Sequence, residues 1–115
     1  MQFFCAIHPS MRPQWASLYQ QLTSHHSESR LVCLEFPTYK EPSTGGPPFG
    51  VASSVYEAHL CHPGAEQPYD DHGNILVEKV EPVKQIGFRR VAHWQANRTH
   101  DVGKNTDWVS VWKMV

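Results

Sequence analysis

Two segments near the carboxyl end of the 115-residue chain, 88–94 and 108–114, alternate regularly between two sets of side chains. One set in each segment comprises Phe88, Arg90, Ala92 and Trp94, and Trp108, Ser110, Trp112 and Met114. A period of two places successive side chains on opposite faces of an extended strand. The pattern therefore predicts two strands that form an antiparallel hairpin, joined by a loop around 97–105.

Two earlier segments, 2–7 and 30–37, are mostly continuous apolar runs, which are typical of strands covered on both faces in a parallel sheet. Between them, apolar side chains recur at helical spacing, at Met11, Trp15, Leu18 and Leu22. This spacing predicts an amphipathic helix over 11–23. Strand, helix and strand with short connections form a βαβ unit. We therefore expect an α/β fold with two parallel strands, flanking helices and a closing antiparallel hairpin.

The middle of the chain is dominated by connections. Residues 37–51 are rich in proline and glycine and predict a long loop, which a helix starting at Ser53 or Ser54 follows. Residues 61–73 are polar and predict a second connection. The segment 74–84 fits either a strand or a short helical turn.

Composition excludes several classes of protein. Hydrophobic residues make up 40% of the chain and charged residues 18%, which is typical of a globular domain rather than a disordered tail. The net charge of −1 disfavours a nucleic-acid or anionic-membrane surface, and no apolar run reaches the length of a membrane span. The first residues lack the basic segment of a signal peptide. Three widely spaced cysteines indicate buried free thiols in a reducing, cytoplasmic setting.

Four pieces of the sequence, in chain order, resemble one enzyme family. They are Phe4-Cys5-Ala6-Ile7-His8-Pro9 with Met11-Arg12-Pro13, Leu34-Glu35-Phe36-Pro37, Gly45-Gly46-Pro47-Pro48-Phe49, and Trp108-Val109-Ser110-Val111-Trp112. Together they are similar to the thiopurine, thiol and halide methyltransferases, and to the fungal thiol methyltransferases in particular. The resemblance implies the C-terminal half of a class I methyltransferase sheet that uses S-adenosylmethionine (AdoMet).

The chain departs from that family in length and in one motif. Family members are about twice as long, and no G-x-G-x-x-G turn is present to hold a nucleotide-like cofactor. We therefore expect residues 1–115 to form a single truncated domain that lacks the cofactor-binding half. The isolated chain is expected to be inactive and not to bind AdoMet.

The resemblance also implies an acceptor side. Arg12 would face an anionic or polarised nucleophile, and the alternative is a solvated arginine at a helix start. The substrate side would comprise Tyr39, Pro47, Pro48 and Phe49, with the two prolines and Phe49 as a stiff apolar lid. The alternative for this loop is packing on the core. Ala6 and Ile7 would lie on the cofactor side.

Two polar features have structural interpretations instead. Glu35 lies inside a predicted strand, so it needs strand-end exposure or a partner such as Arg89 or Arg90. A histidine- and cysteine-rich group comprises His59, Cys61, His62 and His72. Its spacing does not match a zinc pattern, so no metal site is expected.

Three functions remain open from the sequence. The first is methyl transfer to a small thiol or related nucleophile in fungal small-molecule metabolism, with a partner chain that supplies the cofactor half. The second is a non-catalytic partner that docks on a full-length methyltransferase through the exposed strand edge of 2–7. The third is an inert remnant. None of them involves a nucleic acid or a membrane.

Overall fold

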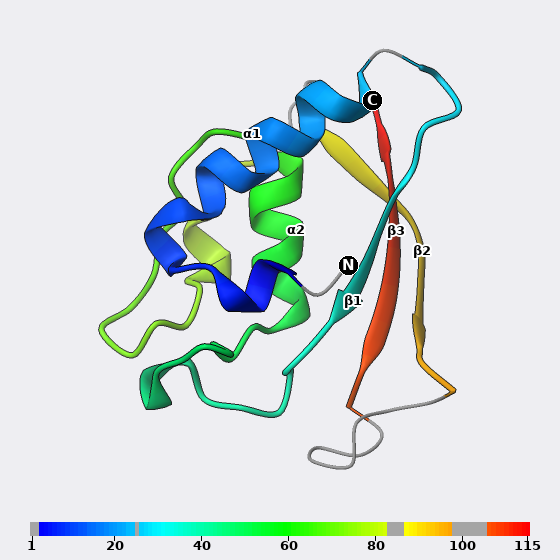
Figure 1. Ribbon diagram of the computed structural model, residues 1–115. Coiled ribbons are helices and arrows are strands. Elements are labelled where there is room, and N and C mark those ends of the chain that lie inside the picture. Colours follow the sequence, from blue (N-terminus) through cyan, green and yellow to red (C-terminus); the bar gives the residue numbers. More distant parts are fainter. Residues whose placement is uncertain (1–2, 25, 83–86, 98–105) are drawn as a thin grey trace.

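The computed structural model describes residues 3–24, 26–82, 87–97 and 106–115. Figure 1 shows a three-stranded sheet with two helices on one of its faces, so the described chain is a small α/β fold. The strands are β1 (Leu31–Glu35), β2 (Phe88–Gln95) and β3 (Trp108–Met114), and the α-helices are α1 (Arg12–Thr23) and α2 (Ser53–Cys61). Short 3-10 helices are η1 (Phe3–Ala6), η2 (Pro9–Met11), η3 (Pro42–Thr44) and η4 (Val77–Lys79).

The central strand of the sheet is β3, and the strand order is β1-β3-β2. Both neighbours pair with β3 in the antiparallel sense, from Leu31 opposite Trp112 on one side and from Phe88 opposite Met114 on the other. The strands of the predicted closing hairpin are therefore confirmed, as are β1 and α2. The predicted grouping of side chains on β2 is wrong, because a register shift between Arg90 and Ala92 places Ala92 and Trp94 on the face opposite to Phe88. The expected loop around 97–105 lies mostly outside the described residues.

The prediction of a strand over 2–7 is wrong, because residues 3–6 form η1. The parallel pair, the βαβ unit and the exposed strand edge at 2–7 are consequently absent from the described residues. A continuous apolar run signals burial rather than one backbone conformation. A helical turn meets that demand here: Phe4 is fully buried, with its ring centroid 4.4 Å from that of Trp15 and 4.6 Å from that of Tyr56.

Helix α1 is confirmed, but its buried stripe is not the expected one. The side chains of Arg12, Trp15 and Ala16 are buried. Met11, Leu18 and Leu22 are half exposed or more, although they share helical spacing with Trp15. The burial of Arg12 and Ala16 rotates the core-facing stripe away from these three residues, so the prediction was wrong for them.

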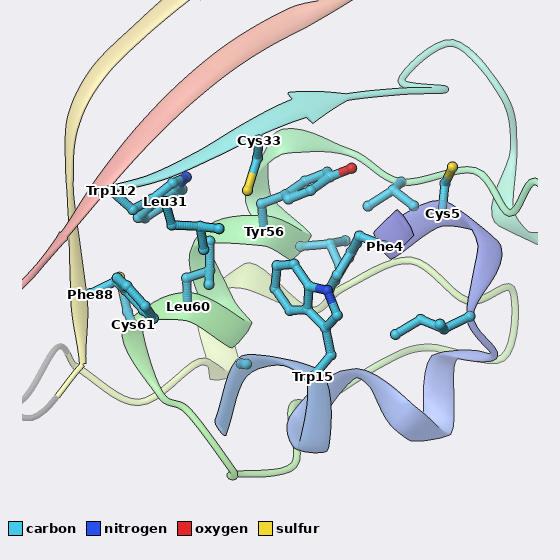
Figure 2. Close-up of a cluster of buried hydrophobic side chains, with 14 residues drawn as sticks. Phe4, Cys5, Trp15, Leu31, Cys33, Tyr56, Leu60, Cys61, Phe88 and Trp112 are labelled. Atoms are coloured by element: carbon cyan, nitrogen blue, oxygen red, sulfur yellow. The ribbon is translucent and has the colours of Figure 1, made fainter. Parts of the chain in front are cut away.

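The hydrophobic core lies between the sheet and the two helices (Figure 2). Trp112 reaches it from β3, Tyr56 and Leu60 from α2, and Trp15 from α1. All three cysteines are buried free thiols, as expected, and burial raises the pKa of Cys33 to about 12. Within the described segments, no helix is long and apolar enough to cross a bilayer.

The second connection contains little regular structure. An isolated antiparallel bridge joins Tyr69 to Ile75, and η4 follows. The segment 74–84 is therefore largely a short helical turn, with residues 83 and 84 outside the described part. The bridge places Tyr69 where its side chain reaches α1 and α2.

Candidate functional site

The proline-rich loop lies across the turn that follows η1. The backbone N–H of Phe49 donates a 2.8 Å hydrogen bond to the carbonyl oxygen of Cys5. The Phe49 ring also meets the His8 ring edge-on, with centroids 6.0 Å apart. Lys40 Nζ donates to the Pro48 carbonyl oxygen at 2.6 Å. These contacts bring the loop and residues 5–8 together.

The other residues of the expected acceptor side are distributed around this loop. Pro47 and Pro48 are exposed and Phe49 is partly buried, so the loop presents an apolar surface. Tyr39 is exposed, with its ring 6.5 Å from the Phe36 ring. Of the two residues expected on the cofactor side, Ala6 is exposed and Ile7 is buried.

Replacement of Gly50 by alanine is expected to disrupt this loop. A Cβ atom at Gly50 would lie 2.1 Å from the carbonyl oxygen of Lys40, and that backbone atom cannot rotate away. We expect a loss of about 2 kcal/mol of unfolding free energy, measured by urea denaturation. Ser43→Ala, at an exposed position of the same loop, is the control and should have little effect. An unchanged midpoint for Gly50→Ala would show that the loop backbone is not held as described.

Arg12 begins α1 and is only 2% exposed, which excludes the solvated arginine considered as its alternative. Its Nη1 donates to the Tyr69 hydroxyl oxygen at 3.1 Å. The guanidinium carbon lies 5.2 Å from the Phe4 ring centroid and 5.7 Å from that of Tyr69. Two aromatic faces at these distances stabilise a cation.

His59 completes this cluster from α2. Its Nε2 lies 2.6 Å from the Tyr69 hydroxyl oxygen. Because Arg12 donates to that oxygen, the arrangement that uses every proton has the hydroxyl donating to Nε2, with the imidazole proton on Nδ1. Burial, and then the nearby Arg12 charge, lower the pKa of His59 to about 3. The imidazole is therefore neutral at physiological pH.

The Arg12 cluster (Arg12, His59, Tyr69) is short of hydrogen-bond acceptors. Arg12 Nε and His59 Nδ1 are both buried without a partner. Within the described part of the chain, no carboxylate forms an ion pair with Arg12. A cavity of about 130 Å³ adjoins the cluster, and its lining includes His59, Tyr69, Ser10, Glu66 and Gln67. A buried cation without a counter-ion is costly, so the cluster suits a ligand that brings an anionic or acceptor group.

The sequence did not single out Tyr69, and it placed His59 in a histidine-rich group rather than beside Arg12. A signal for His59 exists: it follows Val55 and Tyr56 at helical spacing on the buried side of α2. No comparable signal marks Tyr69, which reaches Arg12 from 57 positions away. The described residues contain no group of three metal-ligand side chains.

Glu35 has partners other than those expected. It is fully buried, accepts a 2.5 Å hydrogen bond from Ser53 Oγ, and lies 3.1 Å from His93 Nε2. The prediction of Arg89 or Arg90 was wrong because of the strand register. Arg90 lies in the row of Leu31 and Trp112, at the opposite end of β1 from Glu35. Arg90 instead pairs with Glu57 at 3.7 Å.

This network joins three elements. Glu35 ends β1, Ser53 begins α2, and His93 lies on β2. The proline-rich loop runs between the first two of them. The network therefore fixes both ends of that loop, and we assign Glu35 a structural role.

A buried, acceptor-poor arginine beside a cavity is a feature of a site for a small anionic or polarised molecule. The family model described as thiopurine S-methyltransferase matches residues 1–100. The chain belongs to this family.

Individual relatives agree with this membership. A probable thiol methyltransferase 2 of Arabidopsis thaliana is 31% identical over 97 residues, which cover 84% of this chain and 39% of the relative. Thiocyanate methyltransferase 1 of Brassica oleracea is 41% identical over 90 residues, covering 72% of this chain and 38% of the relative. The chain thus spans about two fifths of the length of these relatives.

Proposed function

We propose that this chain forms the acceptor side of an AdoMet-dependent methyltransferase that acts on a small thiol-type nucleophile. Family membership and the names of the thiol and thiocyanate methyltransferases support the reaction class. The observation that carries the proposal is Arg12: a buried guanidinium with no carboxylate partner among the described residues. It begins the helix that follows residues 5–8, which the apolar loop contacts through Phe49. An anionic nucleophile supplies the charge that this arginine lacks.

The residues of the acceptor side have distinct tasks. Methyl transfer from a sulfonium is an in-line displacement, so the nucleophile must be oriented and water excluded. The Arg12 charge stabilises a thiolate over a thiol. Tyr69 and His59 hold the guanidinium in one orientation. Pro47, Pro48 and Phe49 act as an apolar lid that excludes water from the nucleophile.

We propose that the described residues do not by themselves form a complete AdoMet site. They contain no glycine-rich turn between a strand and a helix, and Ile7, expected on the cofactor side, is buried. We propose that the donor side comes from a stretch equivalent to the other three fifths of the relatives. The chain alone is then inactive. We also propose that the enzyme acts in the cytoplasm, in fungal small-molecule metabolism.

The test is a chimera in which this chain replaces the matched stretch of the Brassica oleracea thiocyanate methyltransferase. The chimera is expected to methylate thiocyanate in the presence of AdoMet, and the chain alone is not. Arg12→Ala should lower kcat/KM by about 10- to 100-fold, because it removes a charged contact to the nucleophile. Arg30→Ala, at an exposed arginine, is the matched control. Full activity of the Arg12→Ala chimera would contradict the proposal.

A second function is favoured by the position of β1 at the border of the sheet. An outer strand offers a backbone edge to which another chain can add. In this case the chain is a non-catalytic partner that associates with a full-length methyltransferase. Mixing the purified chain with the Brassica enzyme distinguishes the two: a change in that enzyme's kcat without activity of the chimera favours the partner role.

A further inference from the structure

The cavity beside the Arg12 cluster has a buried end and an open end. The buried end is formed by His59, which is 1% exposed, and by the partly buried Tyr69. The open end is formed by Ser10 and Glu66, both of which are exposed. A ligand that fills the cavity therefore contacts a water-free region with one end and a hydrated region with the other.

The segment that carries Glu66 is fixed against the start of α1. The backbone N–H of Gly64 donates a 3.1 Å hydrogen bond to the carbonyl oxygen of Pro13. The hydroxyl oxygen of Tyr69 accepts a 3.1 Å hydrogen bond from Arg12. These two contacts lie on either side of Glu66 in the chain. They therefore hold its backbone at the mouth of the cavity.

The buried end is suited to an anionic or acceptor group. His59 Nδ1 is buried without a partner, and it carries the ring proton in the arrangement that uses every proton of the cluster. Arg12 donates to Tyr69, which lines the cavity, and has no carboxylate partner among the described residues. A buried donor without an acceptor is costly. A thiolate at this end supplies the missing acceptor and places a negative charge near the arginine.

The open end has the opposite charge. The Glu66 carboxylate forms no ion pair with any described residue. A simple anion in the cavity is attracted by Arg12 and repelled by Glu66, so the two charges act against each other. A ligand that carries a cation at its outer end is attracted by both. The charges therefore favour a ligand with a negative group at one end and a positive group at the other.

The volume of the cavity limits the distance between these two groups. The cavity measures about 130 Å³, and its wall includes Pro9 and Pro13. A water molecule in the liquid occupies about 30 Å³, so there is room for about four groups of that size. A sulfur and a nitrogen joined by a short aliphatic spacer match this volume, and the two prolines offer the spacer an apolar wall. An aromatic thiol exceeds it.

We infer that the preferred acceptor is a small aliphatic aminothiol, with its sulfur at His59 and its ammonium group at Glu66. This inference rests on the proposed function, because it names the acceptor of the same site. The thiol releases its proton to solvent on binding. Its sulfur then forms a bond to the methyl carbon, while the bond from that carbon to the sulfonium sulfur breaks. The ammonium group keeps its protons, so Glu66 selects the acceptor without taking part in the proton balance.

Binding of cysteamine, a small aminothiol, to the chain tests the inference without methyl transfer. Cysteamine is titrated at neutral pH into the isotope-labelled chain, and NMR follows the ring signals of His59. These signals are expected to shift, with a Kd about 5-fold lower for the native chain than for Glu66→Gln. Glu78→Gln removes the same charge at an exposed position outside the cavity, so this matched control should bind like the native chain. Equal binding by the native chain and Glu66→Gln overturns the inference, as does the absence of any change at His59.

Reversal of the charge at Glu66 gives a second test. Glu66→Lys is expected to weaken the binding of cysteamine and to strengthen that of mercaptopropionate, whose carboxylate then meets a lysine. Mercaptoethanol has no second charge and should bind equally to all variants. The ammonium group of cysteamine also makes its thiol more acidic. Because that effect is the same for every variant, the comparison between variants isolates the contact with residue 66. An unchanged order of the three thiols in Glu66→Lys contradicts the inference.

The chimera separates this inference from the proposed function. In the presence of AdoMet it is expected to methylate cysteamine, and Glu66→Gln should raise KM for cysteamine about 5-fold with little change in kcat. Cysteamine binding that depends on Glu66, in a chain whose chimera methylates no thiol, supports the aminothiol site and contradicts only the proposed function. A chimera that methylates thiocyanate, and in which Glu66→Gln leaves KM for cysteamine unchanged, supports the proposed function and overturns the inference.

Discussion

Lowering the pH from 7 to 4 is expected to destabilise this chain largely through one side chain, His59. Its pKa is about 3 in the folded chain, because of burial first and the Arg12 charge second, and about 6.5 when unfolded. Between these values the unfolded state binds a proton that the folded state does not. The unfolding free energy is therefore unaffected by His59 protonation above about pH 6.5, and it decreases as the pH falls toward 3. The full loss is on the order of 4 kcal/mol.

The measurement is the unfolding free energy from urea denaturation at pH 7, 5 and 4. His59→Gln replaces the imidazole with an amide that does not titrate, and an amide oxygen can still accept from Tyr69. Between pH 7 and pH 4 the unfolding free energy of this variant should decrease clearly less than that of the native chain. His72→Gln, at an exposed histidine, is the control. An unchanged decline in His59→Gln would place the acid-sensitive group elsewhere.

Replacement of His93 by leucine is expected to cost about 2 to 3 kcal/mol of unfolding free energy. The substitution leaves the Ser53 hydroxyl as the hydrogen-bond donor to the buried Glu35 carboxylate among the described residues, and an uncompensated buried charge is strongly destabilising. In the double variant His93→Leu/Glu35→Gln the charge is absent. The two substitutions together should therefore cost less than the sum of their separate effects.

Arg89→Leu is the control for this cycle. The sequence predicted Arg89 as a possible partner of Glu35, but the two side chains lie on opposite faces of the sheet. It should change the unfolding free energy by no more than about 0.5 kcal/mol. Strict additivity of His93→Leu and Glu35→Gln in thermal or urea denaturation would mean that the two side chains do not interact.

The parts of the fold that could be predicted from the sequence are those with a single readable period. Alternation over 88–94 and 108–114 permits only extended strands, and both strands are present. The apolar run 2–7 has no period. It therefore predicted that its side chains are buried, but not whether the backbone forms a strand or a helical turn. Its conformation depends on which neighbours are available, and that is a tertiary property.

The candidate site divides in the same way. The sequence singled out Arg12 and the proline-rich loop through local motifs. The surroundings of Arg12 come from Tyr69, 57 positions away, and from His59 on another helix. The partner of Glu35 depended on the register of β2, which includes an irregularity between Arg90 and Ala92. Neither long-range packing nor register is encoded in a short stretch of sequence.

The order of the strands also constrains how this chain folds. The central strand β3 comes last of the three in the sequence, and β1 precedes it by more than seventy positions in every registered pair. Until β3 is in place, β1 and β2 have no strand partner within the described sheet. Closing so long a stretch of chain costs entropy before any ladder bond is gained, which slows folding. Before β3 is in place, the first half of the chain, with α1, β1 and α2, must therefore be held together by side-chain packing. During this time the backbone of β1 is unpaired, and the chain is most vulnerable to aggregation.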